Sequence, residues 1–201
     1  MTTDRAQHIT RLSERGAATR TALLMAAREI FLTEGYAQAG VTEIVARAGA
    51  SVGSLYHHFS GKAELYLALF EELHNDQARR TRHAVRGARG AGVRDPRQLF
   101  LVGARAYLDG SVEQRELTSL FVRGDGPPGF DLVMRTRLAE WVSKNTEFFA
   151  RSGEPLDQAA AVVTTGALML AVAEVSLSTD TMRAREIADG VIKVLSRLDY
   201  P

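Results

Sequence analysis

The sequence predicts an all-α protein of about nine helices, in which a small N-terminal domain is followed by a larger helical domain. Apolar residues recur at intervals of three and four along almost every long segment, and this spacing is typical of one face of an α-helix. Breaks rich in glycine or proline separate these segments. No stretch alternates apolar and polar residues as a half-buried strand does.

The breaks place each expected helix. Besides two short helices within residues 41–59, we expect helices at 16–34, 61–85, 96–109, 113–122, 130–151, 156–177 and 182–198. Asp95 and Pro96 form a typical helix start, because proline fits the first helical turn. We expect residues 1–14 to form a flexible basic arm, residues 15–62 the first domain and residues 63–201 the larger one.

Composition limits the class of protein. Of the 201 residues, 45% are apolar, which is enough for a real core, and the net charge of +1 does not by itself indicate nucleic-acid binding. There is no cysteine, so disulfides and thiol chemistry are excluded. The N-terminus has no signal-peptide pattern, and the most apolar run, 159–173, is shorter than the roughly 20 residues of a membrane span. We therefore expect a cytoplasmic protein without a membrane partner.

Residues 41–62 hold two short helical patterns separated by a glycine turn. In the first pattern Ile44 and Val45 give an apolar side, and Thr42 stands where an N-cap is expected. Gly49 ends it, because glycine tolerates the left-handed backbone of a tight helix exit.

The second pattern follows directly. Ser51 is placed to cap it, and we expect Val52, Leu55 and Phe59 to point inward. The residues expected to point outward are Ser54, Tyr56, His57 and His58, with Gly53 allowing close backbone approach. Two helices across such a turn are typical of a helix-turn-helix, whose second helix enters the DNA major groove. Other compact helical proteins also contain such a pair, so the spacing alone leaves both readings open.

Three segments in the first third of the chain carry a wider pattern. They read TRTALLMAAREIFLTEGY at 19–36, VTEIVARAGASVGSLYHHF at 41–59 and KAEL at 62–65. This pattern resembles the DNA-binding domain of the TetR (tetracycline repressor-like) family of bacterial transcription regulators. It departs from the family mainly at Ala50, where valine is more common.

The resemblance implies a set of DNA contacts, in which Lys62 and Tyr56 meet phosphates and Ser54 meets base edges. The full set is Arg20, Thr42, Ser51, Val52, Gly53, Ser54, Tyr56, His57 and Lys62. It also implies a homodimer on a pseudo-palindromic double-stranded operator, and a small-molecule effector of unknown identity that releases it. The expected function is therefore a ligand-responsive transcription regulator of the repressor type.

Two basic segments leave alternatives open. Arg5, His8, Arg11 and Arg15 could contact the DNA backbone or minor groove, or belong to a disordered terminus. Seven arginines between residues 79 and 97 could form a second DNA patch. Glycines and Pro96 interrupt that segment, so a solvated helix end followed by a flexible loop is the favoured interpretation.

No pattern indicates catalysis, a cofactor or a metal. His57 and His58 are adjacent, so on a helix their side chains point about 100° apart and do not share an ion easily. The sequence has no Gly-x-Ser-x-Gly elbow and no phosphate-binding glycine loop. We predict that the protein is not an enzyme.

The helix at 130–151 carries a stripe with a single polar member, Asn145. An apolar wall with one hydrogen-bonding group is typical of a small-molecule pocket, whereas a core stripe with a satisfied amide is the alternative. The candidate ligand-binding residues are Arg105, Tyr107, Phe121, Met134, Leu138, Trp141, Asn145, Phe148 and Met169. Arg105 could meet an anionic ligand or pair with a carboxylate of the protein.

The last two helices are candidates for a dimer interface. The helix at 156–177 is apolar nearly all round, so every side of it needs cover. Pairing with a two-fold mate as a four-helix bundle would supply that cover, and burial within one chain is the competing interpretation. The candidate interface residues are Leu168, Val172, Val175, Ile187, Val191, Val194 and Leu198. A helical small-molecule binder or enzyme that does not use DNA remains the alternative to a regulator.

Overall fold

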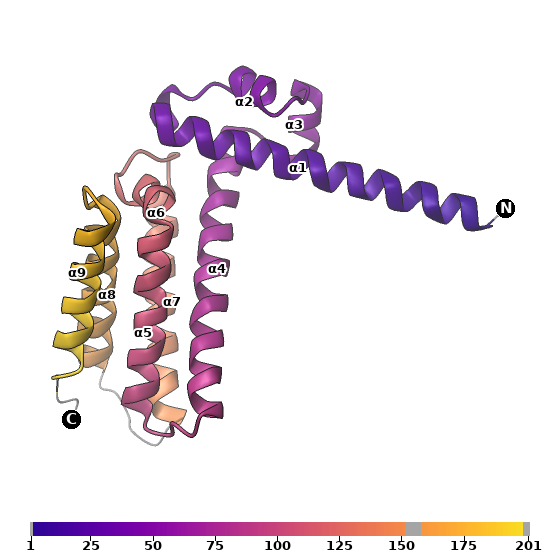
Figure 1. The fold of residues 1–201 in the computed structure, drawn as a ribbon. Coiled ribbons are helices and arrows are strands. Elements are labelled where there is room, and N and C mark those ends of the chain that lie inside the picture. The colour runs from indigo at the N-terminus through magenta and orange to yellow at the C-terminus, as the bar shows by residue number, and fades with distance from the viewer. Residues whose placement is uncertain (1, 152–157, 199–201) are drawn as a thin grey trace. The chain divides into compact units, whose positions relative to one another are not determined.

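A computed structural model describes residues 2–151 and 158–198, with the backbone alone for residues 2–13, 150 and 151. All regular structure in this part is helical, which confirms the all-α prediction, and it comprises nine helices (Figure 1). The chain divides into two units. The first is Met1–Glu72 with Asp125–Pro127, and the second is Leu73–Gly124 with Pro128–Pro201.

The first unit contains three helices and the start of a fourth. These are α1 (Thr2–Gln38), α2 (Val41–Arg47), α3 (Val52–His58) and the first turns of α4 (Lys62–Gly90). Residues 2–14, predicted to form a loose arm, are helical, because no glycine or proline interrupts them before Gly16. The side chains of Arg5, His8 and Arg11 lie outside the described part, so the predicted arm contacts stay a prediction.

The core of the first unit is built on the stripe that the sequence predicted for α1. Leu23, Ala27, Ile30 and Phe31 are all almost fully buried. The helical geometry of α1 ends at Gly35, whose φ of 82° and ψ of 164° lie in a region that is essentially reserved for glycine. The chain leaves the helix there and turns back toward α2.

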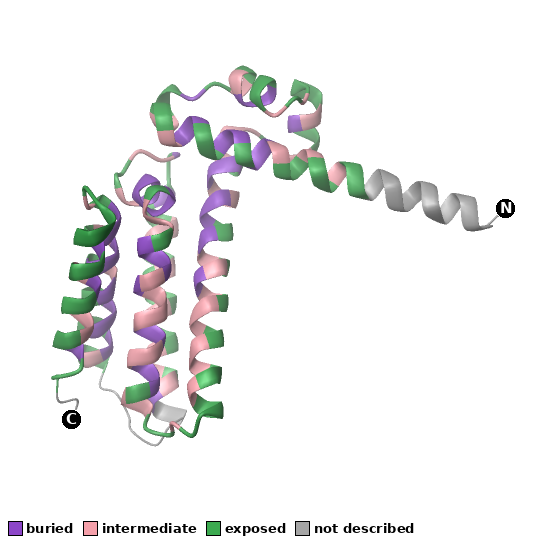
Figure 2. Cartoon of the chain, in the orientation of Figure 1, coloured by how far each residue is buried: buried purple, intermediate pink, exposed green. Residues whose placement is uncertain are grey.

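The second unit contains the rest of α4 and five further helices. They are α5 (Pro96–Glu113), α6 (Arg115–Val122), α7 (Phe130–Arg151), α8 (Gln158–Leu177) and α9 (Thr181–Leu195). Asp95 caps α5 as predicted, because its carboxylate accepts from the Arg97 backbone N–H at 2.9 Å. α8 packs against α5, α6, α7 and α9, and its buried side lies toward these helices (Figure 2). The predicted first turn of α8, at residue 156, lies outside the described residues.

The ends of α4 and α5 differ most from the prediction. α4 continues to Gly90, so the basic segment stays helical for five residues beyond Val85, where the helix was predicted to end in a loop. Arginine is a good helix former, and a cation in the last turn complements the helix dipole, which offsets the cost of Gly87. α5 continues to Glu113, where a helix end near Asp109 was expected.

α8 is also the one helix in residues 2–151 and 158–198 that is long and apolar enough to cross a membrane. Its most apolar 18-residue window is 44% buried inside the protein. A core helix of a soluble protein gives the same pattern, so the helix is weak evidence for a span.

Candidate nucleic-acid interface

The turn between α2 and α3 is a complete Schellman motif. Gly49 has a φ of 62°, which glycine adopts without a Cβ penalty. Its N–H donates to Ala46 O at 3.2 Å, and the Ala50 N–H donates to Val45 O at 2.9 Å. These two bonds satisfy carbonyls that the end of α2 would otherwise leave unpaired. The prediction that Gly49 ends this helix with a left-handed backbone is therefore confirmed.

The start of α2 differs from the prediction. Gly40, with an extended backbone, occupies the N-cap position, and no side chain caps the helix. Thr42, predicted as the N-cap, lies in the first helical turn, where its side chain is exposed. The apolar pattern alone placed this boundary two residues too late.

Ser51 caps α3 as predicted. Its Oγ accepts from the Ser54 backbone N–H at 3.0 Å and lies 2.9 Å from the Ser54 Oγ. The cap fixes the direction in which the chain enters α3. At the other end Phe59 is buried and in extended conformation, so the helix is held at both ends.

One side of α3 is open to solvent. Val52 is 45% exposed and Tyr56 57% exposed, and Gly53 and His57 lie with them, because these positions form a continuous side at 3.6 residues per turn. Leu55 is fully buried on the opposite side. The expectation that Val52 points inward is therefore wrong. The side-chain atom nearest to a Cβ at Gly53 would be the Ser51 Oγ at 3.8 Å, so the backbone is accessible there.

Lys62 has a different role from the predicted phosphate contact. Its Nζ donates to the backbone carbonyls of Tyr36, Ala37 and Ala39 at 2.8, 3.0 and 3.1 Å. The ammonium also lies 4.6 Å from the centroid of the Tyr36 ring. An ammonium has three protons, and all of them are used here to hold the chain that follows the break in α1 at Gly35.

Arg20 also makes contacts within the first unit. Its guanidinium lies 5.0 Å from the Phe59 ring centroid, and its NH1 is 3.7 Å from the Glu72 Oε1. Both partners of the ion pair are about half exposed, so the pair leaves the guanidinium accessible. A phosphate contact by Arg20 stays a prediction.

Asp125 is a structural residue that the sequence analysis missed. Its Oδ2 accepts from the Tyr36 N–H at 2.7 Å, and a Cβ at Gly35 would lie 2.5 Å from the same oxygen. Burial, with the Asp125 charge as a smaller cause, raises the pKa of both Tyr36 and Tyr66. The loop around Asp125 thus supplies the partner for the first N–H after the helix break.

The two histidines of α3 do not form part of a metal site in the described residues. Their ring centroids are 4.9 Å apart with planes at 72°, and no group of three or more His, Cys, Asp or Glu side chains in the described part could hold an ion. The His58 ring faces α1, where a Cβ at Gly16 would lie 3.8 Å from its Cε1. His57 alone lies on the open side.

The residues proposed for a ligand site are spread over α5, α6, α7 and α8 of the second unit. Tyr107 packs edge-on against Trp141, with centroids 4.7 Å apart and planes at 86°. Phe121 is buried against Phe130. In the α7 stripe Leu138 is 39% exposed, whereas Met134, Trp141, Asn145 and Phe148 are half-buried, as is Met169 of α8. The stripe is therefore not a continuous buried wall.

Both polar candidates in this unit have protein partners. The Asn145 Nδ2 donates to the Thr165 Oγ1 at 2.8 Å. Arg105 pairs with Asp109 at 2.9 Å and with Asp189, and hydrogen bonds from these carboxylates raise the pKa of its guanidinium. The structure therefore favours the alternative that Arg105 is neutralised within the protein.

The helix-turn-helix region matches known proteins. Residues 23–69 match the model of bacterial regulatory proteins of the tetR family. The chain is 40% identical over 87 residues to the transcriptional activator FasR of Mycolicibacterium smegmatis, which covers 43% of this chain and 37% of FasR. It is 37% identical over 59 residues to the transcriptional repressor BepR of Brucella suis, which covers 29% of this chain and 28% of BepR.

The helix-turn-helix region, residues 23–69, is therefore that of the TetR family. The chain spans only about a third of the length of these curated relatives. A solved structure of a SmeT–triclosan complex shares the fold over 89% of this chain and 90% of that one, with a TM-score of 0.69 and 17% identity. The relatives' sequence likeness is thus confined to part of the chain, and the fold likeness extends over most of it.

The candidate dimer residues do not all lie on the same side of the helices that carry them. Leu168, Val172 and Val175 are buried against other helices of the second unit, so they are core residues and not interface residues. Ile187 and Val191 are half-buried against the same core. Val194 is 59% exposed and Leu198 37% exposed, so only these two remain available to a partner.

α8 nevertheless has a second apolar side. Val163 and Leu170 are each 65% exposed and Leu177 is 51% exposed. These positions recur at intervals of seven, with the small Gly166 and Ala167 exposed between them. The prediction that α8 is apolar all round is confirmed, but the residues chosen for the interface lie on the side that packs against their own chain, because periodicity does not say which side that is.

Proposed function

We propose that this protein is a DNA-binding transcription regulator in which the open side of α3 lies in the major groove. The observation that carries the proposal is the exposure of Val52, Gly53, Tyr56 and His57 on a helix capped by Ser51 and anchored by Leu55. Small and hydrogen-bonding side chains on a rigid helix can read base edges and meet phosphates. Such a regulator acts on chromosomal DNA, so we place it in the cytoplasm.

A second copy of the chain completes this proposal. The exposed stripe of Val163, Leu170 and Leu177 on α8, with Val194 on α9, would pair with the same stripe of a two-fold mate. The exposed Gly166 lets two helices approach closely. A dimer sets two copies of α3 on one face of a pseudo-palindromic duplex, with half-sites about one helical turn apart.

A small molecule bound in the second unit would control DNA binding. The SmeT structure, which shares this fold, is a complex with triclosan. A ligand that prefers one arrangement of the dimer shifts its population, by no more than its differential affinity. Of the named relatives one is an activator and one a repressor. We propose repression, because occupancy of an operator suffices for it, whereas activation needs a further contact with the transcription machinery.

The experiment is a selection of genomic DNA fragments with the intact protein, followed by sedimentation of the complex. We expect a pseudo-palindromic sequence to be enriched and bound by a dimer. Leu170→Asp should yield a monomer with far weaker operator binding, because it places a charge in a dry interface. Leu132→Asp, at a position 62% exposed on α7, is the matched control and should stay dimeric. A wild-type protein that enriches no sequence would favour a helical binder that does not use DNA.

A further inference from the structure

Two buried polar atoms on α4 have no hydrogen-bond partner among the described parts of the protein. They are the Gln77 Oε1 and the Thr81 Oγ1. Gln77 is only 2% exposed, and the two residues lie one helical turn apart on the same side of α4. Buried polar atoms almost always have a partner, so this pair calls for an explanation.

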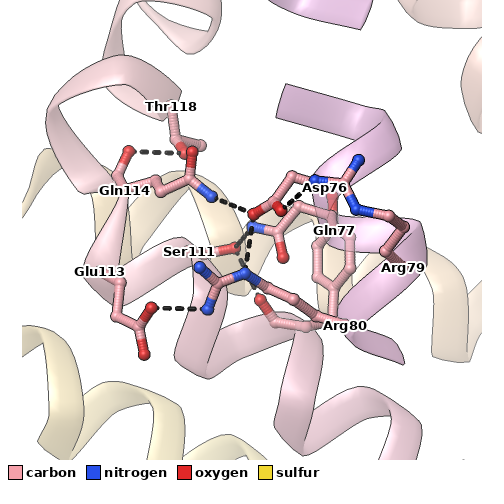
Figure 3. A network of polar contacts seen from close by, with 9 residues as sticks. Asp76, Gln77, Arg79, Arg80, Ser111, Glu113, Gln114 and Thr118 are labelled. Carbon is pink, nitrogen blue, oxygen red and sulfur yellow. Dashed lines mark hydrogen bonds and ion pairs between the residues drawn. The ribbon is translucent and has the colours of Figure 1, made fainter. Parts of the chain in front are cut away.

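The neighbouring hydrogen bonds fix the orientation of the Gln77 amide (Figure 3). The Ser111 Oγ donates its proton to the Tyr107 carbonyl at 3.0 Å, so toward Gln77 it can only accept. The Gln77 Nε2 donates to that Oγ at 3.3 Å. Exchanging the amide oxygen and nitrogen would set two acceptors against each other. The unpartnered atom of Gln77 is therefore an acceptor.

The Gln77 Oε1 and the methyl group of Thr81 face positions of α5 that have no side chain. A Cβ at Gly110 would collide with the Gln77 Oε1, and a Cβ at Gly103 would lie 3.3 Å from the methyl groups of Thr81 and Val85. Gly110 has no side chain that could donate to the Gln77 Oε1, so the position of α5 opposite this acceptor leaves it uncompensated.

The charges beside this pair compensate one another. Arg80 binds Asp76 at 2.7 Å and Glu113 at 2.5 Å, and Arg79 binds Asp76 at 2.7 Å (Figure 3). The Gln114 Nε2 donates to the same Asp76 carboxylate at 2.7 Å. A charged molecule at Gln77 would have to compete with these pairs for its counterion, and burying it without one is costly.

Aromatic side chains stand on the same part of the second unit. Tyr107, whose carbonyl receives the Ser111 proton, packs edge-on against Trp141 at 4.7 Å. His74, one turn before Gln77 on α4, has its ring 6.1 Å from that of Trp141. The surroundings therefore suit a flat or apolar body that carries one polar group.

We propose that the effector of this protein is a neutral molecule with an aromatic or apolar body and one hydroxyl or N–H group. That group donates a hydrogen bond to the Gln77 Oε1. Thr81 shares the same polar group through its hydroxyl, which can donate or accept. The proposal rests on the proposed ligand response and adds to it the chemical class of the ligand and the residues that select it. Anions, and analogues with an acceptor only, are rejected at this position.

Three probes with the same body test the class. They are 4-tert-butylphenol, which has a donor, 4-tert-butylanisole, which has none, and 4-tert-butylbenzoate, which is charged. Binding is measured by calorimetry and by the fluorescence of Trp141, the only tryptophan. We expect the phenol to bind at least about tenfold more tightly than either analogue, because only it satisfies the buried acceptor. Equal binding of the three, or binding of none, overturns the proposal.

Two near-isosteric variants test the residues. Gln77→Met and Thr81→Val should each lower phenol affinity by roughly tenfold while the free protein melts at the same or a higher temperature, since each removes an unsatisfied polar atom. Thr118→Val is the matched control. The Thr118 Oγ1 already donates to the Gln114 carbonyl at 3.0 Å, so this variant should lose stability and keep its phenol affinity. Lost stability in Gln77→Met or Thr81→Val with unchanged affinity would make these atoms structural and contradict the proposal.

Binding of selected genomic DNA by the same preparations separates this proposal from the proposed function. If the wild-type protein binds DNA and ignores the phenol, the ligand class is wrong and the regulator stands. If it enriches no DNA and still binds the phenol through Gln77, the regulator is wrong and the binding site stands. We expect DNA binding together with its weakening by the phenol.

Discussion

The two units differ in how completely they satisfy their polar side chains. In the first, Ser51 caps α3, Lys62 binds three carbonyls and Asp125 binds the N–H of Tyr36. In the second, Gln77 and Thr81 each keep a buried polar atom without a described partner. Full satisfaction holds one geometry, as a surface that must fit a DNA groove requires. An unsatisfied acceptor instead retains the capacity to bind, so the difference agrees with the proposal that the first unit binds DNA and the second unit binds the ligand.

Gly35→Val should have the largest effect and should act on the first unit alone. The residue has a φ of 82°, and a Cβ would lie 2.5 Å from the Asp125 Oδ2, so we expect a loss of about 3 kcal/mol or more. Circular dichroism in urea should show the first unit unfolding early, while Trp141 fluorescence, which reports the second unit, changes little. Gly40→Ala is the control, since a Cβ at Gly40 would meet nothing within 4 Å apart from its own neighbours in the chain. Equal loss in both variants would contradict this account.

Lys62→Met should cost about 2 kcal/mol, because it leaves three backbone carbonyls without a charged donor. Chemical unfolding measures this loss. Lys144→Met is the control and should cost little, since that ammonium lies 3.9 Å from Glu140 at the surface. The salt dependence of DNA binding should keep its slope in Lys62→Met. If the slope of log affinity against log salt were smaller by about 0.9 in Lys62→Met, Lys62 would instead contact a phosphate.

Tyr66 of the first unit and Asp76 of the second should contribute pH dependence at opposite extremes of pH. Burial raises the pKa of Tyr66, so the stability that its neutral form contributes is present below pH about 10 and is lost as the pH rises above it. Burial alone would raise the pKa of Asp76, but the hydrogen bond and charge of Arg80 lower it overall. Its contribution is present above pH about 4 and is lost below it. Thermal melts should show that Asp76→Asn weakens only the acid dependence and Tyr66→Phe only the alkaline dependence. Neither is abolished, because the pKa of Glu64 is also lowered and that of Tyr107 is also raised.

Asn145→Leu should have the smallest effect, a loss of about 1 kcal/mol in thermal stability, because it breaks the bond to the Thr165 Oγ1. In the background of Thr165→Val the same change should cost much less, since the partner is already gone. If Asn145→Leu leaves stability unchanged and lowers phenol affinity instead, Asn145 belongs to the ligand site, and that site extends to α7.

Local chemistry explains which features the sequence could predict. Gly49 and Ser51 act through bonds to neighbours within five residues, so their spacing was sufficient. Lys62 and Asp125 bind the chain that follows the break at Gly35, from 23 to 89 residues away, and no local pattern indicates such a partner. Val52 was misplaced because a helix of seven residues is too short for its periodicity to fix a buried side.

The second unit shows the same limit for helix faces. The all-round apolar pattern of α8 predicted two covered sides without saying that Leu168 faces its own chain and Leu170 faces out. The sequence does carry a signal for the buried Gln77. This residue continues the four-residue interval of Leu65, Leu69 and Leu73 on α4, and a polar residue in line with a buried leucine stripe indicates a buried amide that needs a partner.

The central claim is that the open side of α3 binds DNA. Its most direct test is the affinity of the wild-type protein, Tyr56→Ala and Met25→Ala for a duplex selected from genomic fragments, measured by fluorescence anisotropy over a range of salt. Tyr56 is 57% exposed on α3, and Met25 is 61% exposed on α1. We predict that Tyr56→Ala binds at least about tenfold more weakly without losing stability, and that Met25→Ala binds like the wild type. Equal affinity of all three proteins would contradict the claim.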